Sequence, residues 1–235
     1  MSPNYSGEIL GIKARSAVVV VLLTVFVGAF VIYIAAFARQ RPPSVTVTQG
    51  PNGEVTLVLQ TVGSLGHGGH PDWPSFLVQQ KDGSWEQSTI FNLPAHSTVH
   101  VKVLEYDTQT GLRNNFFAQP QGLVDNALTV DGETVTGADI IKTYEPSLAA
   151  HTWTVPGLGV SVPFVGVEND APNQCTLAPC NTTQAHRTIE FIIKTGKPGH
   201  FRWQCIVPCA PGGFLFGNGG PMQTVGFMDG YVNVA

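Results

Sequence analysis

The residues of this chain that could do chemistry are cysteine, histidine and methionine side chains in its C-terminal half. His151 opens the stretch HTWTVPGLG, Cys205 and Cys209 lie four residues apart in GHFRWQCIVPC, and Met222 follows them. Thiolate, imidazole and thioether groups are soft donors that suit copper in its lower oxidation state. The sequence has no G-x-S-x-G, no H-E-x-x-H and no phosphate-cradling glycine loop. Metal chemistry is therefore favoured over nucleophilic or nucleotide chemistry.

The four cysteines form two pairs with different expectations. Cys175 and Cys180 lie in QCTLAPC, a proline-containing loop. We expect them to form a disulfide in an oxidising compartment, because so short a loop closes at little entropic cost. Cys205 and Cys209 are also close enough in sequence to reach the Cα separation of ~4.4–6.8 Å that a disulfide tolerates. That second pair is thus open to two interpretations, metal ligation or a disulfide.

A second candidate metal site lies nearer the N-terminus. His67 and His70 stand three residues apart in GHGGHPDW, beside Asp72. An H-x-x-H pair next to a carboxylate suits zinc or copper. The alternative is a polar turn that faces solvent.

The two C-terminal blocks carry a specific resemblance. In cytochrome c oxidase subunit II the first block reads H-S-F-x-V-P-x-L-G and the second Y-x-G-Q-C-S-E-x-C-G-x-x-H-x-x-M, and HTWTVPGLG and FRWQCIVPC resemble them. The resemblance implies a cupredoxin domain with a binuclear, CuA-type copper site. It places His151, Cys205 and Cys209 at one histidine and both bridging cysteines, with Gln204 matching as well. The backbone carbonyl of Val207 would replace a weak carbonyl ligand of the family.

The chain departs from the family after Cys209. The family's second histidine falls at Gly213 and its methionine at Phe216, and no histidine follows His200. The ligand set is therefore one imidazole short. Met222 would complete the shell from a lengthened loop, or a histidine of the 66–70 segment would do so.

The elements that must position these residues are short strands. Apolar and polar residues alternate over 54–62, 98–106, 187–195 and 199–207, with glycine- and proline-rich turns between them. Such alternation predicts an antiparallel sandwich or barrel, and the resemblance specifies an all-β, cupredoxin-like Greek-key sandwich. We expect this extracytoplasmic domain to span residues 54–235.

One transmembrane helix is expected before the domain. Residues 17–38 carry no charge, and 22 residues at ~1.5 Å each cross the ~30 Å core of a bilayer. Residues 1–16 would form a cytoplasmic tail, and Pro42-Pro43 places a linker over residues 39–53. The alternative is a signal peptide cleaved after Ala36-Phe37-Ala38.

Composition limits the partners. The chain has 12 Lys and Arg against 16 Asp and Glu, which gives a net charge of −4. No basic surplus exists to neutralise phosphates, so we expect no nucleic-acid partner.

Three functions remain open. The first is a single-pass membrane subunit that transfers electrons through copper, with other subunits of a respiratory-type oxidoreductase and an electron-carrier protein as partners. The second is a metal-free accessory subunit that keeps the fold around a degenerate copper site. The third is copper delivery, in which incomplete ligation helps release. We do not expect the chain to be catalytic alone.

Overall fold

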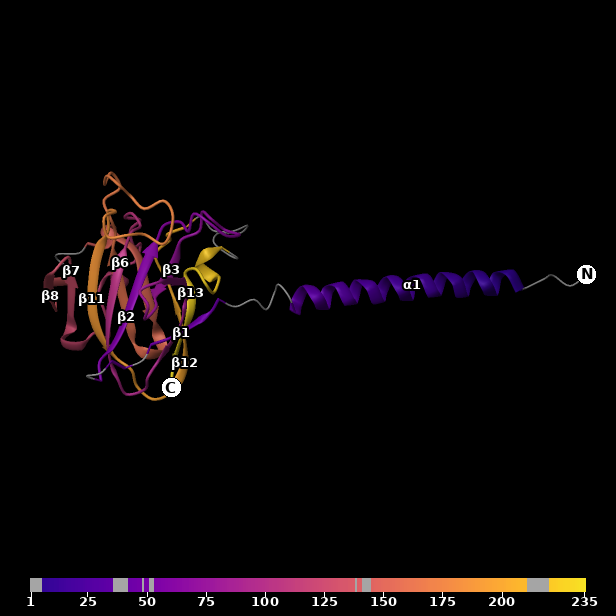
Figure 1. The fold of residues 1–235 in the computed structure, drawn as a ribbon, viewed down its shortest axis with the longest axis horizontal. Helices are drawn as coiled ribbons and strands as arrows, with labels where there is room; N and C mark the ends of the chain where they lie inside the picture. Colours follow the sequence, from indigo (N-terminus) through magenta and orange to yellow (C-terminus); the bar gives the residue numbers. More distant parts are fainter. Residues whose placement is uncertain are drawn as a thin grey trace, which may run out of the picture. The chain divides into compact units, whose positions relative to one another are not determined.

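The chain divides into two compact units, residues 1–41 and residues 42–235. The first contains a single helix and the second is a β-sandwich (Figure 1). The computed structural model describes residues 6–35, 42–47, 49–50, 53–137, 139–140, 145–210 and 220–235.

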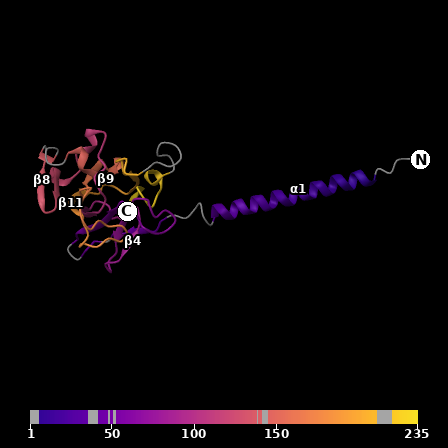
Figure 2. The same cartoon turned by 90° about the horizontal axis from the view of Figure 1, so that it is seen from above.

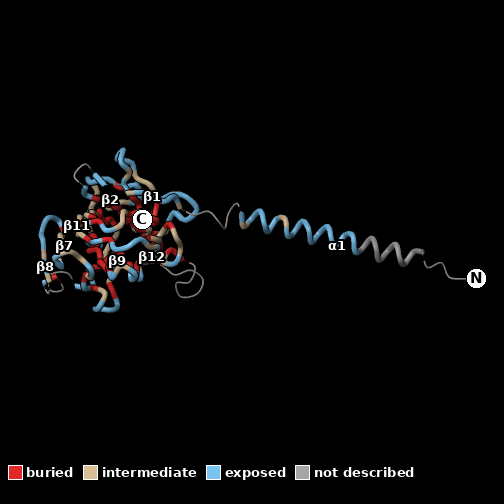
Figure 3. The backbone as a smooth tube through the Cα atoms, turned by 90° about the horizontal axis from the view of Figure 1, so that it is seen from below, coloured by how far each residue is buried: buried red, intermediate tan, exposed pale blue. Residues whose placement is uncertain are grey.

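Helix α1 spans Ser6–Tyr33. It begins inside the expected tail, because residues 8–15 include good helix formers such as Glu, Leu, Lys and Arg. Its segment Ser16–Tyr33 is long and apolar enough to cross a membrane. The residues of this segment are exposed almost throughout, as the tube colours show (Figure 3). Residues 36–38 of the expected span lie outside the described residues.

The second unit is built from two sheets that face each other (Figures 1 and 2). In spatial order, the six-stranded sheet comprises β1 (Ser44–Thr46), β5 (Ile90–Leu93), β13 (Asp229–Val234), β12 (Gly199–Gln204), β9 (Ala149–Val155) and β10 (Val160–Val165). The seven-stranded sheet comprises β4 (Trp85–Gln87), β3 (Ser75–Gln79), β2 (Val55–Val62), β6 (Thr98–Glu105), β11 (Arg187–Lys194), β7 (Ala127–Val130) and β8 (Glu133–Thr136). The predicted all-β sandwich after one helix is confirmed.

Strand pairing corrects one part of the expectation. Strand β1 pairs with β5, β5 with β13, and β2 with β6, all in parallel. The sheets are therefore mixed and not purely antiparallel. Parallel neighbours arise because these strands are connected through other strands and not by tight hairpins.

Strand β1 also corrects the domain boundary. It lies within residues 39–53, which the double proline predicts to be a linker, yet it pairs with β5 and buries Val45 in the core. A short edge strand of three residues shows too little alternation to be recognised in a sequence. The compact unit begins at Pro42 and not at residue 54.

A large aromatic core fixes the inner strands. The fully buried rings include Trp153 and Trp203, and the buried tube segments of Figure 3 mark the same interior. Trp203 stacks on Phe91, meets Phe76 edge-on, and donates a hydrogen bond from Nε1 to the carbonyl of Thr89 at 2.9 Å. Burying such side chains stabilises the fold by roughly 1.5–3 kcal/mol each. The strand ends next to this core are consequently held rigidly.

Candidate metal centre

Cys205 is positioned by strand β12. Trp203 and Cys205 are two residues apart, so both point into the sandwich, and Cys205 follows directly on the last residue of the strand. The Cys205 N–H donates to the carbonyl of Met228 at 2.9 Å, which continues the pairing with the C-terminal segment. The thiol is thus fixed at the end of a buried strand.

His151 reaches the same place from strand β9. It shares an inward-facing row with Trp153 and Val155 and is fully buried. Its Nδ1 lies 3.8 Å from the Cys205 Sγ. His151, Cys205 and Cys209 each bring one donor atom into a cluster whose atoms all lie within 4.8 Å of one another. The structure therefore brings together the three residues that the sequence selects.

Two more sulfur atoms continue the cluster. The Cys205 and Cys209 Sγ atoms are 3.6 Å apart, so the two thiols are free and not joined as a disulfide. The Cys209 Sγ lies 3.3 Å from the Sδ of Met222, in the short helix η6 (Pro221–Gln223). Gln204 Nε2 donates to the Met222 carbonyl at 3.4 Å and ties η6 to the end of β12.

Thr152 clamps the cysteine loop from the neighbouring strand. Its backbone N–H donates to the Cys205 Sγ at 3.3 Å, and its Oγ1 accepts the Ile206 N–H at 2.8 Å. The Val207 carbonyl accepts the Cys209 N–H at 2.8 Å. An N–H directed at sulfur favours the thiolate, so the clamp prepares Cys205 to bind a cation.

Behind His151 lie two carboxylates that sequence reasoning missed. The His151 Nε2 is 3.1 Å from the Asp107 Oδ2 and 4.0 Å from the Glu105 Oε1, although neither is aligned as a hydrogen bond. Glu105 accepts the Asp107 N–H at 2.8 Å. The signal was available in the strand alternation, because Val101, Val103 and Glu105 of β6 all point inward.

A glycine makes room for this arrangement. A Cβ on Gly63 would lie 2.3 Å from the Asp107 Oδ1, so only glycine allows the carboxylate to rest here against the end of β2. The Asp107 Oδ1 accepts the Thr108 N–H at 2.7 Å. The space at Gly63 and the hydrogen bond from the Thr108 N–H thus orient Asp107 so that its Oδ2 faces His151.

The electrostatics favour one thiolate in the pair. Burial disfavours the charged form of Cys205, but hydrogen bonding with Cys209 and His151 outweighs it and holds the pKa of Cys205 well below its usual range. The pKa of Cys209 is well above its usual range, because its thiol is hydrogen-bonded to Cys205 and is buried. Cys205 therefore loses its proton first, and Cys209 retains one until a cation displaces it.

On the Nε2 side of the imidazole, two carboxylates change the pKa of His151. Burial opposes the imidazolium, but the charge of Glu105 and the contact with Asp107 raise the pKa of His151 well above its usual range. Burial raises the pKa of Glu105 to about 8.

The donor set fits a copper site. One imidazole nitrogen, two thiol sulfurs and one thioether sulfur converge on a region in which His151 and Cys205 are buried. These donors are soft, and carboxylates stand only behind the imidazole and not among the sulfurs, which disfavours hard ions such as Mg²⁺ or Ca²⁺.

Other predicted residues lie outside this cluster. His67 and His70 are exposed in the loop between β2 and β3, and His70 stacks on Trp73 with ring centroids 3.8 Å apart. Within the part of the chain that the structure describes, neither joins the metal-ligating group. Gly213 and Phe216, the family positions for histidine and methionine, lie outside the described residues.

Cys175 and Cys180 form a disulfide, as predicted, with their Cα atoms 5.8 Å apart. Gln60 of β2 holds the bridged loop: its Nε2 donates to the Cys180 carbonyl and its Oε1 accepts the Cys180 N–H. The bridge contributes no ligand to the cluster.

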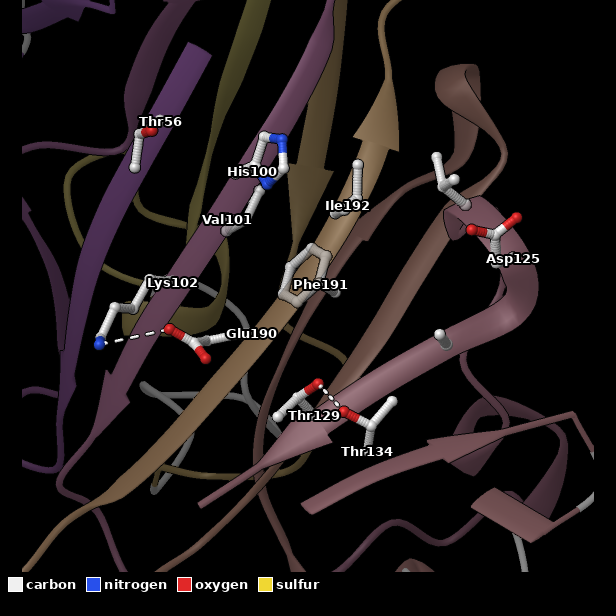
Figure 4. Close-up of a pocket in the computed structure, with 12 residues that line it drawn as sticks. Thr56, His100, Val101, Lys102, Asp125, Thr129, Thr134, Glu190, Phe191 and Ile192 are labelled. Atoms are coloured by element: carbon white, nitrogen blue, oxygen red, sulfur yellow. Dashed lines mark hydrogen bonds and ion pairs between the residues drawn. The ribbon is translucent and has the colours of Figure 1, made fainter. Parts of the chain in front are cut away.

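A groove of about 450 Å³ lies on the outer face of the seven-stranded sheet (Figure 4). Lys102 and Glu190 form an ion pair across it at 3.3 Å, and the Thr129 and Thr134 hydroxyls bond to each other at 2.7 Å. These four polar side chains pair with one another, and we assign no ligand to the groove.

Comparison with known proteins finds similarity in structure only. No protein-family model and no curated protein sequence matches the chain. Rusticyanin from Thiobacillus ferrooxidans is similar, with 15 % identity, a TM-score of 0.34, and coverage of 86 % of this chain and 90 % of that chain. A chain of a heme-copper terminal oxidase dimer is also similar, with 14 % identity, a TM-score of 0.33, and coverage of 96 % and 99 %. At these identities and TM-scores, the function must be inferred from the geometry of the site.

Proposed function

We propose that this protein is a membrane-anchored, extracytoplasmic cupredoxin subunit that transfers single electrons through copper within a membrane oxidoreductase complex. The observation that carries the proposal is the convergence of His151, Cys205, Cys209 and Met222 at one end of the sandwich. When bound there, copper supplies a one-electron carrier that alternates between Cu(I) and Cu(II). The uncharged segment Ser16–Tyr33 of helix α1 supplies the anchor.

The residues around the site support transfer of electrons over chemical catalysis. The Thr152 clamp and the Trp203 core fix the ligands, so little would reorganise when the charge of the site changes. Asp107 and Glu105 face the Nε2 of His151, which leaves Nδ1 directed at the sulfurs. Cys209 and Met222 are only partly buried, so one side of the cluster is accessible to a redox partner.

The free thiols favour a functional site over a relic. A metal-free accessory subunit in an oxidising compartment would gain stability by linking Cys205 to Cys209, yet the two sulfurs are held 3.6 Å apart. Three sulfurs also suit a protein that carries Cu(I) and releases it to another protein. The test below therefore includes copper delivery among its outcomes.

The test is spectroscopy of the full-length protein in detergent. After loading with copper under reducing conditions and then oxidation, we expect thiolate-to-copper absorption in the visible range that a one-electron reductant bleaches reversibly. The Cys205→Ser variant should lose the absorption, whereas the His70→Ala variant, changed at an exposed histidine, should retain it.

The contrary results are distinct. Wild-type protein that takes up no copper and carries a Cys205–Cys209 disulfide would establish the accessory subunit. Copper that binds but leaves on oxidation would establish delivery.

A further inference from the structure

We infer that the cluster holds one copper ion per chain and not a pair. This inference rests on the proposed copper function and concerns the stoichiometry of the same site. It follows from an inventory of the donors, from the distances between them, and from the ligands that a second ion would lack.

Only one histidine of the described residues lies in the cluster. Each of the seven histidines is among the described residues, and of these only His151 belongs to the cluster. His200 is occupied with Asn233 and Tyr231, and His70 is stacked on Trp73. The residues that the structure leaves undescribed contain no histidine and no cysteine. Although all seven histidines are among the described residues, no second imidazole lies in the cluster.

His151 itself cannot serve two ions. Its Nδ1 faces the Cys205 sulfur at 3.8 Å, but its Nε2 faces away, 3.1 Å from the Asp107 carboxylate. One imidazole thus offers one ligand atom to the cluster. The carboxylates stand on the far side of the ring and contribute none.

The distances suit donors that share one ion. Two ligand atoms about 2.0–2.3 Å from a first-row metal, at tetrahedral angles, lie roughly 3.3–3.8 Å from each other. The separations here are 3.6 Å between the Cys205 and Cys209 sulfurs and 3.8 Å between the Cys205 sulfur and the His151 Nδ1. Met222 adds a fourth donor, with its sulfur 3.3 Å from the Cys209 sulfur. One nitrogen and three sulfurs would thus supply the four donors that one tetrahedral ion needs.

A second ion would be left with weak ligands. Once His151 and Met222 are used, the remaining donor near the bridging sulfurs is the Val207 carbonyl, 3.9 Å from the Cys205 sulfur. That oxygen already accepts the Cys209 N–H. A lone carbonyl is a hard, neutral donor and a poor partner for copper.

The experiment measures copper stoichiometry and electronic structure in the full-length protein. Reduced protein in detergent is saturated with Cu(I), desalted, assayed for copper and protein, then oxidised and examined by electron paramagnetic resonance. We expect one copper per chain and the hyperfine pattern of a single copper nucleus. Met222→Leu should keep this stoichiometry but bind copper more weakly, because three strong donors remain.

The outcomes separate this inference from the proposed function. Two coppers per chain, with the hyperfine pattern of an electron shared between two nuclei, would overturn the inference and leave the electron-transfer proposal standing. No copper would overturn both. One copper per chain that survives Cys205→Ser would put the ion elsewhere and also overturn the inference. His70→Ala is the matched control and should change neither stoichiometry nor spectrum.

Discussion

At the scale of single residues, the site depends on groups on both sides of one imidazole. Sulfurs lie on the Nδ1 side of His151, and the carboxylates of Asp107 and Glu105 lie on its Nε2 side. A carboxylate behind a metal-binding histidine fixes the tautomer and raises the basicity of the ligand nitrogen. Asp107 lies 3.1 Å from the His151 Nε2, so in the proposed copper site it would be a positioning residue that acts through His151.

Replacing Asp107 tests this role. Asp107→Asn keeps the shape of the side chain but removes its charge, so we expect the affinity for Cu(I) to fall by about 10- to 100-fold while the fold is retained. Competition with a Cu(I) chelator measures the affinity, and the reduction potential should rise because the imidazole becomes a weaker donor to Cu(II). Asp170→Asn, at an exposed loop position, is the matched control. Equal affinities for the two variants would remove Asp107 from the site.

The buried Glu105 predicts an unusual pH dependence of stability. Burial raises its pKa from 4.5 to about 8, so the folded state keeps a proton that the unfolded chain releases at a lower pH. The free energy of unfolding of the metal-free protein should fall as the pH rises from about 4.5 to about 8. One such group contributes at most about 1.4 kcal/mol per pH unit. The raised pKa of His151 also makes the free energy of unfolding fall with rising pH, and this decrease continues above the usual pKa of histidine.

The contribution of Glu105 is measured by urea denaturation between about pH 4.5 and about pH 8. The wild type is compared with the Glu105→Gln variant. The variant cannot ionise, so its stability should decline less steeply. Parallel stability profiles for the two proteins would show that Glu105 ionises in the folded state as it does in the unfolded chain.

At the scale of elements, strands with long alternating segments were predictable, and short or fully buried strands were not. The alternating segments 54–62, 98–106 and 187–195 became β2, β6 and β11 with ends shifted by at most one residue. Strands β9 and β10 are buried at every position, so only a few threonine and serine residues between apolar ones mark them in the sequence. Glu105 lies in the inward-facing row of the predicted strand 98–106, but its approach to His151 depends on how the two sheets pack against each other.

The disulfide loop stabilises an element without serving the metal. Its bridge encloses a short segment and is held against β2 by Gln60. Cys175→Ser/Cys180→Ser should therefore lower the free energy of unfolding by about 2 kcal/mol, the value expected for so short a loop. The copper spectrum should not change, because neither cysteine belongs to the cluster. Urea denaturation with and without reductant provides the measurement.

Adding reductant should destabilise the wild type and leave the double variant unaffected. If the copper absorption of the double variant differed from that of the wild type, the disulfide loop would be shown to affect the metal site.

At the scale of the whole molecule, two units of different composition are joined in one chain. The helix presents apolar side chains with no packing partner among the described residues of its own unit, whereas the sandwich buries its apolar residues in a closed core. Residues 42–235 carry 8 basic and 15 acidic side chains. In the proposed electron-transfer function, this excess of acidic side chains would favour a basic electron carrier as the partner through long-range attraction. Helix α1 and the cysteine cluster belong to different units, so a chain that begins at Pro42 tests the proposed site without the proposed anchor.

The redox state of the disulfide reports whether the sandwich lies in an oxidising compartment. If α1 directs the sandwich across a membrane into an oxidising compartment and stays attached, the full-length protein should resist carbonate extraction, and Cys175 and Cys180 should be oxidised. A truncated chain that begins at Pro42 should stay in the cytoplasm with both thiols free to alkylation. Mass spectrometry of the membrane protein decides between an anchor and a cleaved signal. An intact N-terminus supports the anchor, and a new one at Arg39 would replace it with a secreted domain.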